Sequence, residues 1–431
     1  MNEKLEKDGI PIRVEVTANY TYEHVINELA RGESPYDLLT AYIGTSMRYW
    51  HSEIPGYHDL AYFELLADLT DEIEKYPSVL SVMSGCKRVA ASVGGRIFGI
   101  PMDNWNTWNN YTPTLVKSSY ALPLFHDPQD FVDYFTEVYN GINGTLVHVP
   151  SFKTAPPYPF HRTYKEWPVL VDYDGLFMYD EDGVSLYVGS DVFEQDSHWM
   201  SVMREARFLR PSFYDAGETV MGVLGGGNWN NSFFKLWEEG KLNTITLAPE
   251  KPTIDDSSGY HVIPSGHNPE PVLIFLDWVY SRPENYDLVS LGVEGEHYMQ
   301  TDSDHRVERI KSTSDNFEYV PLVGFDCQLS LARPRGVARE TDFEYLAALD
   351  RLERAVVLPS HGFAFDPSPV QEQYDAVIEL LETGDYTKIL CGELPFSERE
   401  RVLSELSEAG LYEVLNECQK QLTEYREMVG R

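Results

Sequence analysis

The sequence predicts an α/β fold of more than one domain that ends in helices. The chain has 431 residues, which is room for two or three domains of about 150 residues each. Short runs in which apolar and charged residues alternate, as in strands, take turns with runs of helical periodicity. In the last tract, residues 411–425, apolar residues recur every three or four positions, which predicts an amphipathic helix.

The first third of the chain predicts alternating helices and strands. Pro77 and Pro101 mark two of the boundaries, because proline cannot continue a helix or donate a hydrogen bond to a sheet. In chain order the expected elements are the last turns of a helix over 1–9, a strand over 12–16, a helix over 23–30, an extended segment over 37–42, a helical tract over 60–76 and a short apolar strand over 96–101.

Further signals organise the rest of the chain. Residues 268–270, with a proline at the first helical position, start a helix, and residues 272–280 are almost wholly apolar. This helix must therefore be buried on most of its sides, Trp278 included. Ser397 and Glu400 have the spacing of a capping box. We also expect strands within 172–188, joined by a turn at Asp182 and Gly183, and a helix over 193–209.

The charge balance excludes some classes of partner. Lys and Arg number 34 against 69 Asp and Glu, so the net charge is −35, which repels nucleic acid and anionic membrane surfaces. No apolar run approaches the roughly 20 residues that span a bilayer. The start has no apolar signal core, and no cysteine near it could carry a lipid anchor. The cysteines, of which Cys418 fits a core position, form no CxxC pair for zinc or redox chemistry; they are Cys86, Cys327, Cys391 and Cys418.

Familiar catalytic motifs are absent from the sequence. We find no nucleophile elbow, P-loop, HExxH or GxGxxG, and the glycine-rich run 222–227 matches none of them. Close carboxylate pairs, such as Asp172 with Asp174 or Asp180 with Asp182, are expected in turns of a chain this acidic. His297 has no histidine at ligand spacing and fits a structural role. We therefore predict no catalytic residue, no metal site and no cofactor.

Two clusters of aromatic and amide residues are the candidate binding site. Sugars present flat C–H faces and rims of hydroxyls, so their sites combine Trp or Tyr platforms with Asn, Asp and Gln hydrogen-bonders. One cluster, within residues 103–111, follows the strand over 96–101, and the other, residues 228–231, follows the glycine-rich run 222–227. Core aromatics at strand ends explain the three tryptophans equally well. The candidate ligand-binding residues are Asp103, Asn104, Trp105, Trp108, Asn228, Trp229 and Asn230.

Several segments together resemble the extracellular solute-binding proteins of carbohydrate ABC importers. They cover most of the chain in the order of the family-1 type, and the last of them resemble the C-terminal domain of unknown function found in its lipoprotein branch. The matching segments are 68–71, 75–77, 98–101, 269–278, 285–288, 292–298, 362–370, 409–411 and 419–422.

The resemblance implies a two-lobed periplasmic-binding-protein-like fold of type II, with a hinge between the lobes. It assigns residues 1–105 and 266–335 to the first α/β lobe, and residues 106–265 and 336–431 to the second lobe with its C-terminal helices. An oligosaccharide would bind in the cleft and pass to a membrane permease. The protein would be a monomer, and its full-length precursor an extracellular lipoprotein with a signal peptide that this chain lacks.

This chain departs from the family pattern in two places. The family begins with a strand and a helix ahead of the strand that matches 12–16, so we expect 12–16 and 37–42 to flank an unfilled position in the first sheet. After Tyr111 the usual charged start of a helix is replaced by residues 112–123, so no ligand residue can be assigned there.

Two other hypotheses about the class of protein stay open. A glycoside hydrolase shares aromatic platforms, and would show two carboxyl groups about 5 to 10 Å apart across its cleft. A cytosolic protein of a halophile would share the acidic composition, because such a surface suits high salt. A melting curve in low salt distinguishes that case.

Overall fold

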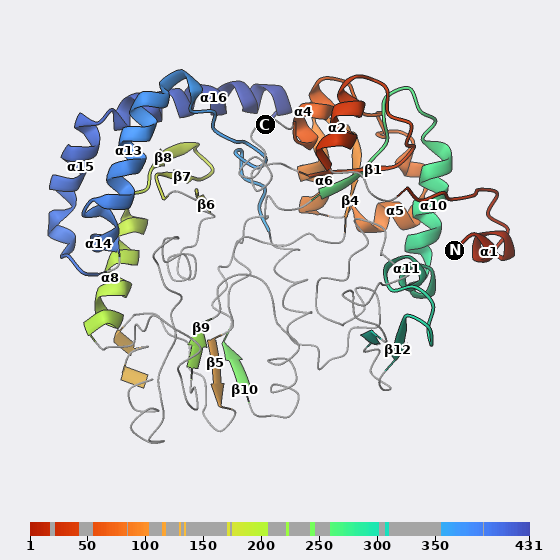
Figure 1. Cartoon of the computed structure of the whole chain (residues 1–431), viewed down its shortest axis with the longest axis horizontal. Coiled ribbons are helices and arrows are strands. Elements are labelled where there is room, and N and C mark those ends of the chain that lie inside the picture. The colour runs from red at the N-terminus through yellow and green to blue at the C-terminus, as the bar shows by residue number, and fades with distance from the viewer. Residues whose placement is uncertain are drawn as a thin grey trace.

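The computed structural model describes residues 1–17, 22–42, 55–83, 85–102, 114–117, 129–130, 133–134, 170–172, 175–205, 221–223, 242–245, 259–300, 307–309, 355–390 and 392–431. The elements form two groups, each around its own hydrophobic core, on the right and the left of Figure 1. A separate sheet lies below them in that view. The first group contains α1 (Asn2–Lys7), α2 (Tyr22–Ala30), β1 (Leu39–Tyr42), α4 (Tyr57–Tyr62), η1 (Ile73–Lys75), α5 (Pro77–Val82), α6 (Cys86–Ala91), β2 (Ser92–Val93), β3 (Arg96–Ile97), β4 (Gly99–Pro101), β11 (Gly259–Val262), α10 (Glu270–Ser281) and α11 (Pro283–Ser290).

The central sheet of the first group has the strand order β1-β11-β4. β11 is antiparallel to both neighbours, so β1 and β4 run in the same direction. The predictions of a helix near the start, a helix over 23–30, and strands over 37–42 and 96–101 are confirmed by α1, α2, β1, β3 and β4.

The prediction of a strand over 12–16 is wrong. These residues have no regular secondary structure and belong to no sheet of the described residues. The main chain of Val14 instead exchanges two hydrogen bonds with the side-chain amide of Asn2, each 2.9 Å long. Ile12 and Val14 lie against the first core while Val16 is exposed, so the alternation reflects one face of an irregular segment.

The helical tract predicted over 60–76 is also wrong in most of its length. α4 ends at Tyr62, and Glu64 has a left-handed φ of 57°. Residues 65–67 then lie along 263–265, with the amide of Ala67 donating to Ile263 O and the amide of Ser265 donating to Leu65 O, both at 2.8 Å. This long-range pairing overrides the local helical pattern, and only the short η1 remains helical before Pro77.

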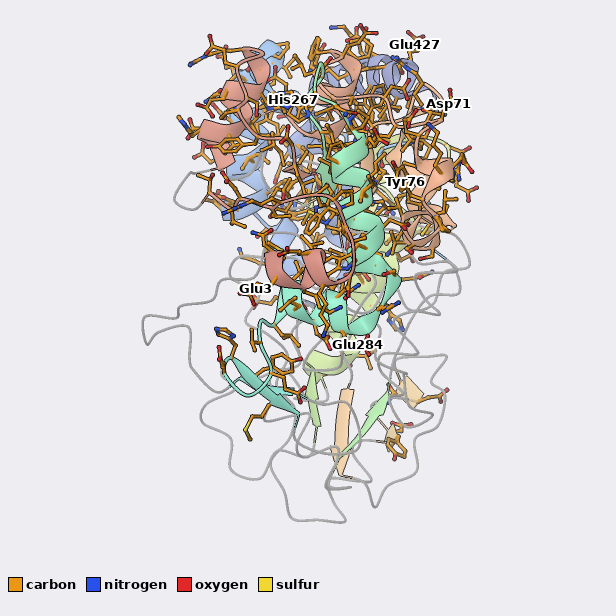
Figure 2. The ribbon with its side chains drawn as sticks, turned by 90° about the vertical axis from the view of Figure 1, so that its right-hand side faces the viewer. Glu3, Asp71, Tyr76, His267, Glu284 and Glu427 are labelled. Carbon is orange, nitrogen blue, oxygen red and sulfur yellow. The ribbon has the colours of Figure 1, made fainter. Side chains whose placement is uncertain are left out.

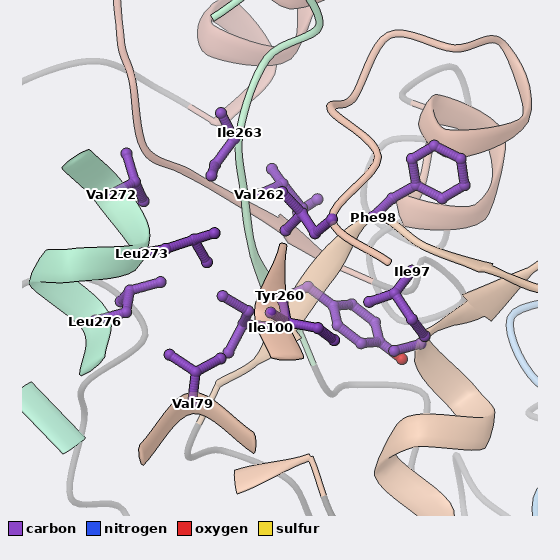
Figure 3. Packing of buried hydrophobic residues seen from close by; sticks show 14 of the residues in the cluster. Val79, Ile97, Phe98, Ile100, Tyr260, Val262, Ile263, Val272, Leu273 and Leu276 are labelled. Carbon is purple, nitrogen blue, oxygen red and sulfur yellow. The ribbon is translucent and has the colours of Figure 1, made fainter. Parts of the chain in front are cut away.

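The apolar helix α10 packs against the first core, as predicted. Figure 3 shows Leu273 and Leu276 pointing toward Ile100 of β4 and Val79 of α5. Figure 2 shows α10 between the labelled residues His267, which precedes it, and Glu284, which follows it. Trp278 is buried, as expected, and its indole Nε1–H donates to Asp8 at 2.9 Å.

Asp277 is the charged residue that interrupts the apolar face of α10. Its Oδ1 accepts the amides of Ser78 at 2.7 Å and Val79 at 3.3 Å, which are the first donors of α5. A carboxylate at this position satisfies orphan N–H groups and complements the positive end of the helix dipole. The residue that breaks the apolar run therefore joins two helices.

The second group surrounds a core of its own. Its hairpin turn has Asp180 Oδ1 accepting the amides of Asp182 and Gly183, which confirms the predicted turn. Cys418 is buried, as predicted, 3.7 Å from the hydroxyl of Tyr179. The elements are β6 (Leu170–Val171), β7 (Phe177–Tyr179), β8 (Val184–Leu186), α8 (Asp191–Glu205), η3 (Ser368–Val370), α13 (Gln371–Thr383), α14 (Tyr386–Leu390), η4 (Phe396–Glu398), α15 (Arg399–Glu408) and α16 (Leu411–Val429).

The capping box predicted at Ser397 and Glu400 does not form. Ser397 lies inside η4, and α15 begins at Arg399 without a side-chain cap. Ion pairs connect this corner instead, because Arg401 reaches Asp385 just before α14, Glu398 of η4 and Glu405 of its own helix. The predicted final helix is confirmed by α16, and the helix predicted over 193–209 by α8 up to residue 205.

The third sheet joins strands from the middle of the chain in the order β10-β5-β9. Its strands are β5 (Thr114–Lys117), β9 (Met221–Val223) and β10 (Leu242–Ile245), and a separate pair consists of β12 (Tyr298–Gln300) and β13 (Val307–Arg309). The lobe boundaries stay a prediction, but β11 lies within 106–265 and pairs in the first sheet. Among the described residues, no helix is long and apolar enough to cross a membrane.

Candidate functional site

The seven predicted binding residues lie outside the described part of the structure. They are Asp103, Asn104, Trp105, Trp108, Asn228, Trp229 and Asn230. The strands that lead into both clusters are described, and they show where the chain enters and leaves each one. The candidate site is therefore built from these strand ends.

The first cluster follows the point where the chain leaves the first sheet. The last residues of β1 and β4 lie beside the first residues of β11, with Tyr42 opposite Gly259. The amide of Met102 donates to Gly259 O at 2.9 Å. The chain thus leaves the first sheet at 102 and returns to it beside the same point at 259.

Gly259 packs closely against side chains of both neighbouring strand ends at this crossover. A Cβ on Gly259 would lie 2.9 Å from Met102 Sδ and 3.1 Å from Cδ1 of Tyr42. Atoms that close must shift, so a larger residue would displace the side chain of Met102 and press on the ring of Tyr42. The crossover is a tightly fitted point rather than an open loop.

The third sheet pairs the strand that follows the first cluster, β5, with the strand that precedes the second cluster, β9. Thr114, the first residue of β5, is paired with Val223, the last residue of β9, and with Ile245, the last residue of β10. In the sequence only residues 111–113 separate Asn110 from β5, and only 224–227 separate β9 from Asn228. Both clusters are therefore attached to the same end of the third sheet.

The histidine of β11, His261, and its neighbour Tyr260 are buried. His261 of β11 is 2% exposed, and burial lowers its pKa to about 3, so it is neutral at physiological pH. Its neighbour Tyr260 stacks on Tyr57 with ring centroids 3.9 Å apart, and burial raises the pKa of Tyr260 well above its usual value. The Tyr57–Tyr260 stack packs the sheet against α4.

His297 has the structural role that the sequence favours. Its Nδ1 accepts the amide of Val293 at 2.9 Å, and its ring packs on Gly292, whose φ is +95°. Asp172 likewise closes a turn, because its Oδ1 accepts the amides of Leu176 and Phe177. In the described segments, no group of three His, Cys, Asp or Glu residues could hold a metal ion.

Comparison with solved structures identifies the fold. The N-glycan transport solute-binding protein NgtS of Streptococcus pneumoniae matches with a TM-score of 0.59 and 16% identity, over 93% of this chain and 88% of that one. An HMO-binding, ABC-transporter-associated solute-binding protein of Bifidobacterium longum infantis matches with a TM-score of 0.55 and 13% identity, over 94% and 90%. The chain has the fold of extracellular solute-binding proteins.

The solute-binding fold confirms the predicted two-lobed α/β class with a helical C-terminal part. A family-1 extracellular solute-binding protein of Alicyclobacillus acidocaldarius has it too, with a TM-score of 0.50 and 11% identity over 90% of this chain and 86% of that one. Residues 359–427 match the model of a domain of unknown function, DUF3502. No curated protein sequence matches the chain. The resemblance found in the sequence is therefore confirmed at the level of the fold.

Proposed function

We propose that this chain is an extracellular solute-binding protein that captures an oligosaccharide between its lobes and delivers it to the permease of an ABC importer. It acts without catalysis, as a monomer, and its precursor is a cell-surface lipoprotein. The observation that carries this proposal is the solute-binding fold together with the two aromatic and amide clusters, each attached to described strand ends. Solved relatives of this fold support it, because NgtS was crystallised with Man1GlcNAc.

The positions of the strand ends support a shared site for the two clusters. A chain spans at most about 3.6 Å per residue, so Asn110 and Asn228 are each tethered within a few residues of the paired Thr114 and Val223. Open α/β sheets place ligands beyond the carboxyl ends of their strands, near a change of strand order. Met102 and Gly259 mark such a crossover in the first sheet. The chemistry of the site would be stacking on tryptophan with amide and carboxylate hydrogen bonds to hydroxyls.

The experiment that tests the proposal is a thermal-shift screen of the whole chain with a panel of neutral and acidic oligosaccharides. A ligand at 100 times its dissociation constant stabilises a fold by roughly 2.7 kcal/mol, which raises the melting temperature measurably. We expect at least one oligosaccharide to do so, with binding confirmed by calorimetry. Cleavage of the sugar during the titration would instead support the glycoside hydrolase, and no shift across the panel would contradict sugar capture.

A further inference from the structure

A narrow polar contact joins the two hydrophobic cores. Tyr57, Ala90 and Ala91 belong to the first core, and Phe363, Tyr425 and Val429 to the second. α16 contacts β8 in the second group and α4 and β2 in the first. In Figure 1 it runs along the top of the molecule from the left-hand group to the right-hand group. We call the contact of residues 360–362 and 425–431 with α4, α6 and β2 the joint.

Hydrogen bonds to main-chain groups hold the joint together. The guanidinium of Arg431 donates to the carbonyl of Ala90 at 2.9 Å and to those of Val89 and His361 at 3.3 Å. The bonds to Val89 and Ala90 cross the joint. The bond from Arg431 to His361 O lies within one side of it, as does the bond that the hydroxyl of Tyr425 donates to the same carbonyl at 2.6 Å. Polar contacts of this kind, in contrast to a continuous apolar core, characterise surfaces between parts that can separate.

One amide reports directly on the joint. The N–H of Gly94, in the turn between β2 and β3, donates to Val429 O of α16 at 3.0 Å. Gly430 packs beside the same turn, with a Cβ position only 3.3 Å from Gly94 Cα. This hydrogen bond forms between the two groups and is lost when they separate.

His58 lies at the centre of the joint with one nitrogen unused. Its Nε2–H donates to Ala90 O at 3.2 Å, which leaves the lone pair on Nδ1 in the neutral ring. Nδ1 is buried and has no hydrogen-bond partner among the described residues. It faces Gly362, where a Cβ would lie 2.4 Å from Nδ1 and 2.6 Å from the hydroxyl of Tyr425. No side chain beyond hydrogen fits at Gly362, whose φ is +84°.

The surroundings of His58 oppose a positive charge on its ring. Burial, the charge of Arg431 and the nearby His361 hold the pKa of His58 well below its usual value. His361 and Tyr425 present their rings edge-on, with centroids 6.0 Å from that of His58. On α4, the neighbour of His58 is Tyr57. Burial raises the pKa of Tyr57, and the negative charge of Asp68 raises it further. A second proton on His58 would place a positive charge near that of Arg431, and the new Nδ1–H would have no hydrogen-bond acceptor among the described residues.

We propose that the joint is an acid-releasable latch: protonation of His58 at Nδ1 separates residues 360–362 and 425–431 from α4, α6 and β2, while both cores stay folded. The cost of keeping a buried histidine neutral rises as pH falls below the value at which a free imidazole takes a proton. Opening the joint exposes Nδ1 to water and relieves that cost. The consequence for ligand capture rests on the proposed function, because release lets the two groups change their relative placement.

Hydrogen exchange of the whole chain, without sugar, tests the latch. Peptides containing Gly94 are compared at pH 7.5 and pH 5.0, after correction for the intrinsic rate, with peptides from α10 and α13 as references for the two cores. We expect the protection of the Gly94 peptides to fall at least tenfold at the lower pH. The α10 peptides also lose protection because their core contains the buried His261, but at pH 5.0 both reference peptides should stay at least tenfold better protected than the Gly94 peptides. Equal protection of the Gly94 peptides at both pH values, or Gly94 peptides as well protected at pH 5.0 as those of α10 and α13, overturns the latch.

A variant and a matched control assign the response to one residue. His58→Gln can keep an N–H donor to Ala90 O but cannot be protonated, so it should abolish the acid response. His267→Gln changes an accessible histidine that contacts Asp37 away from the joint, and should leave the response intact. A full response in His58→Gln overturns the proposal. The wild-type measurement alone decides the latch if that variant fails to fold, and neither readout depends on sugar binding.

Discussion

Trp229 is the residue whose removal tests the binding site most directly. In the proposed function Trp229 is a sugar platform, so we expect Trp229→Ala to weaken binding at least tenfold, which corresponds to about 1.4 kcal/mol. Calorimetry with the best ligand of the thermal-shift screen measures the change. Tyr412→Ala is the control, because Tyr412 is an exposed aromatic on α16 and its loss should leave the affinity unchanged. Unaltered affinity in a folded Trp229 variant would remove this residue from the site.

Gly259 tests the crossover between the clusters. Gly259→Ala places a Cβ 2.9 Å from Met102 Sδ, and overpacking of this kind costs roughly 1–3 kcal/mol. Urea unfolding measures the loss. Gly189→Ala is the control, since its nearest neighbour, Leu186 O, is 3.8 Å away and little change is expected. Equal stability of the two variants would show that the side chain of Met102 moves aside at little cost.

His261 makes the stability of the chain depend on pH. Its folded pKa of about 3 lies below the unfolded value of about 6.5. The unfolded chain therefore binds the extra proton first, and stability falls as pH drops below about 6.5. Between about pH 6.5 and pH 5 the loss is about 2 kcal/mol. Urea unfolding at these pH values measures it, and His261→Gln should flatten the slope; an unchanged slope would contradict the burial argument.

At the scale of elements, Asp277 connects α10 to α5. Asp277→Ala leaves the amides of Ser78 and Val79 without their acceptor, and loss of such a cap costs about 0.5–2 kcal/mol. Thermal and urea unfolding measure the change. Glu270→Gln, in the first turn of α10, is the control and should change stability by less than about 0.5 kcal/mol. An Asp277 variant as stable as this control would show that water replaces the cap.

The elements also show which parts of the fold can be predicted from the sequence. α10 is predictable because its proline start and apolar run are local signals, and α16 because its apolar spacing is regular. The tract 60–76 is not, because residues 65–67 pair with 263–265 about two hundred positions away. The joint is missed for the same reason: His58, His361 and Arg431 are lone residues until the fold assembles them. The seven candidate binding residues stay a prediction.

For the whole molecule, the two cores predict unfolding in more than one step. The described apolar clusters are separate, and the joint between them is polar. Cooperativity across such a contact is weaker than within a single core, so the two-state description should fail. Calorimetry of the ligand-free chain should give a calorimetric enthalpy larger than the van't Hoff enthalpy.

A ligand held by both lobes should change this behaviour. A sugar that contacts both groups binds only when both are folded, so it stabilises them together and couples their unfolding. We expect the two enthalpies to converge and the transition to sharpen when the oligosaccharide is present. Trp229→Ala, which loses affinity, should need more ligand for the same convergence. A ligand that raised the stability of one step alone would show that the sugar sits on a single lobe, which contradicts a site shared by the two clusters.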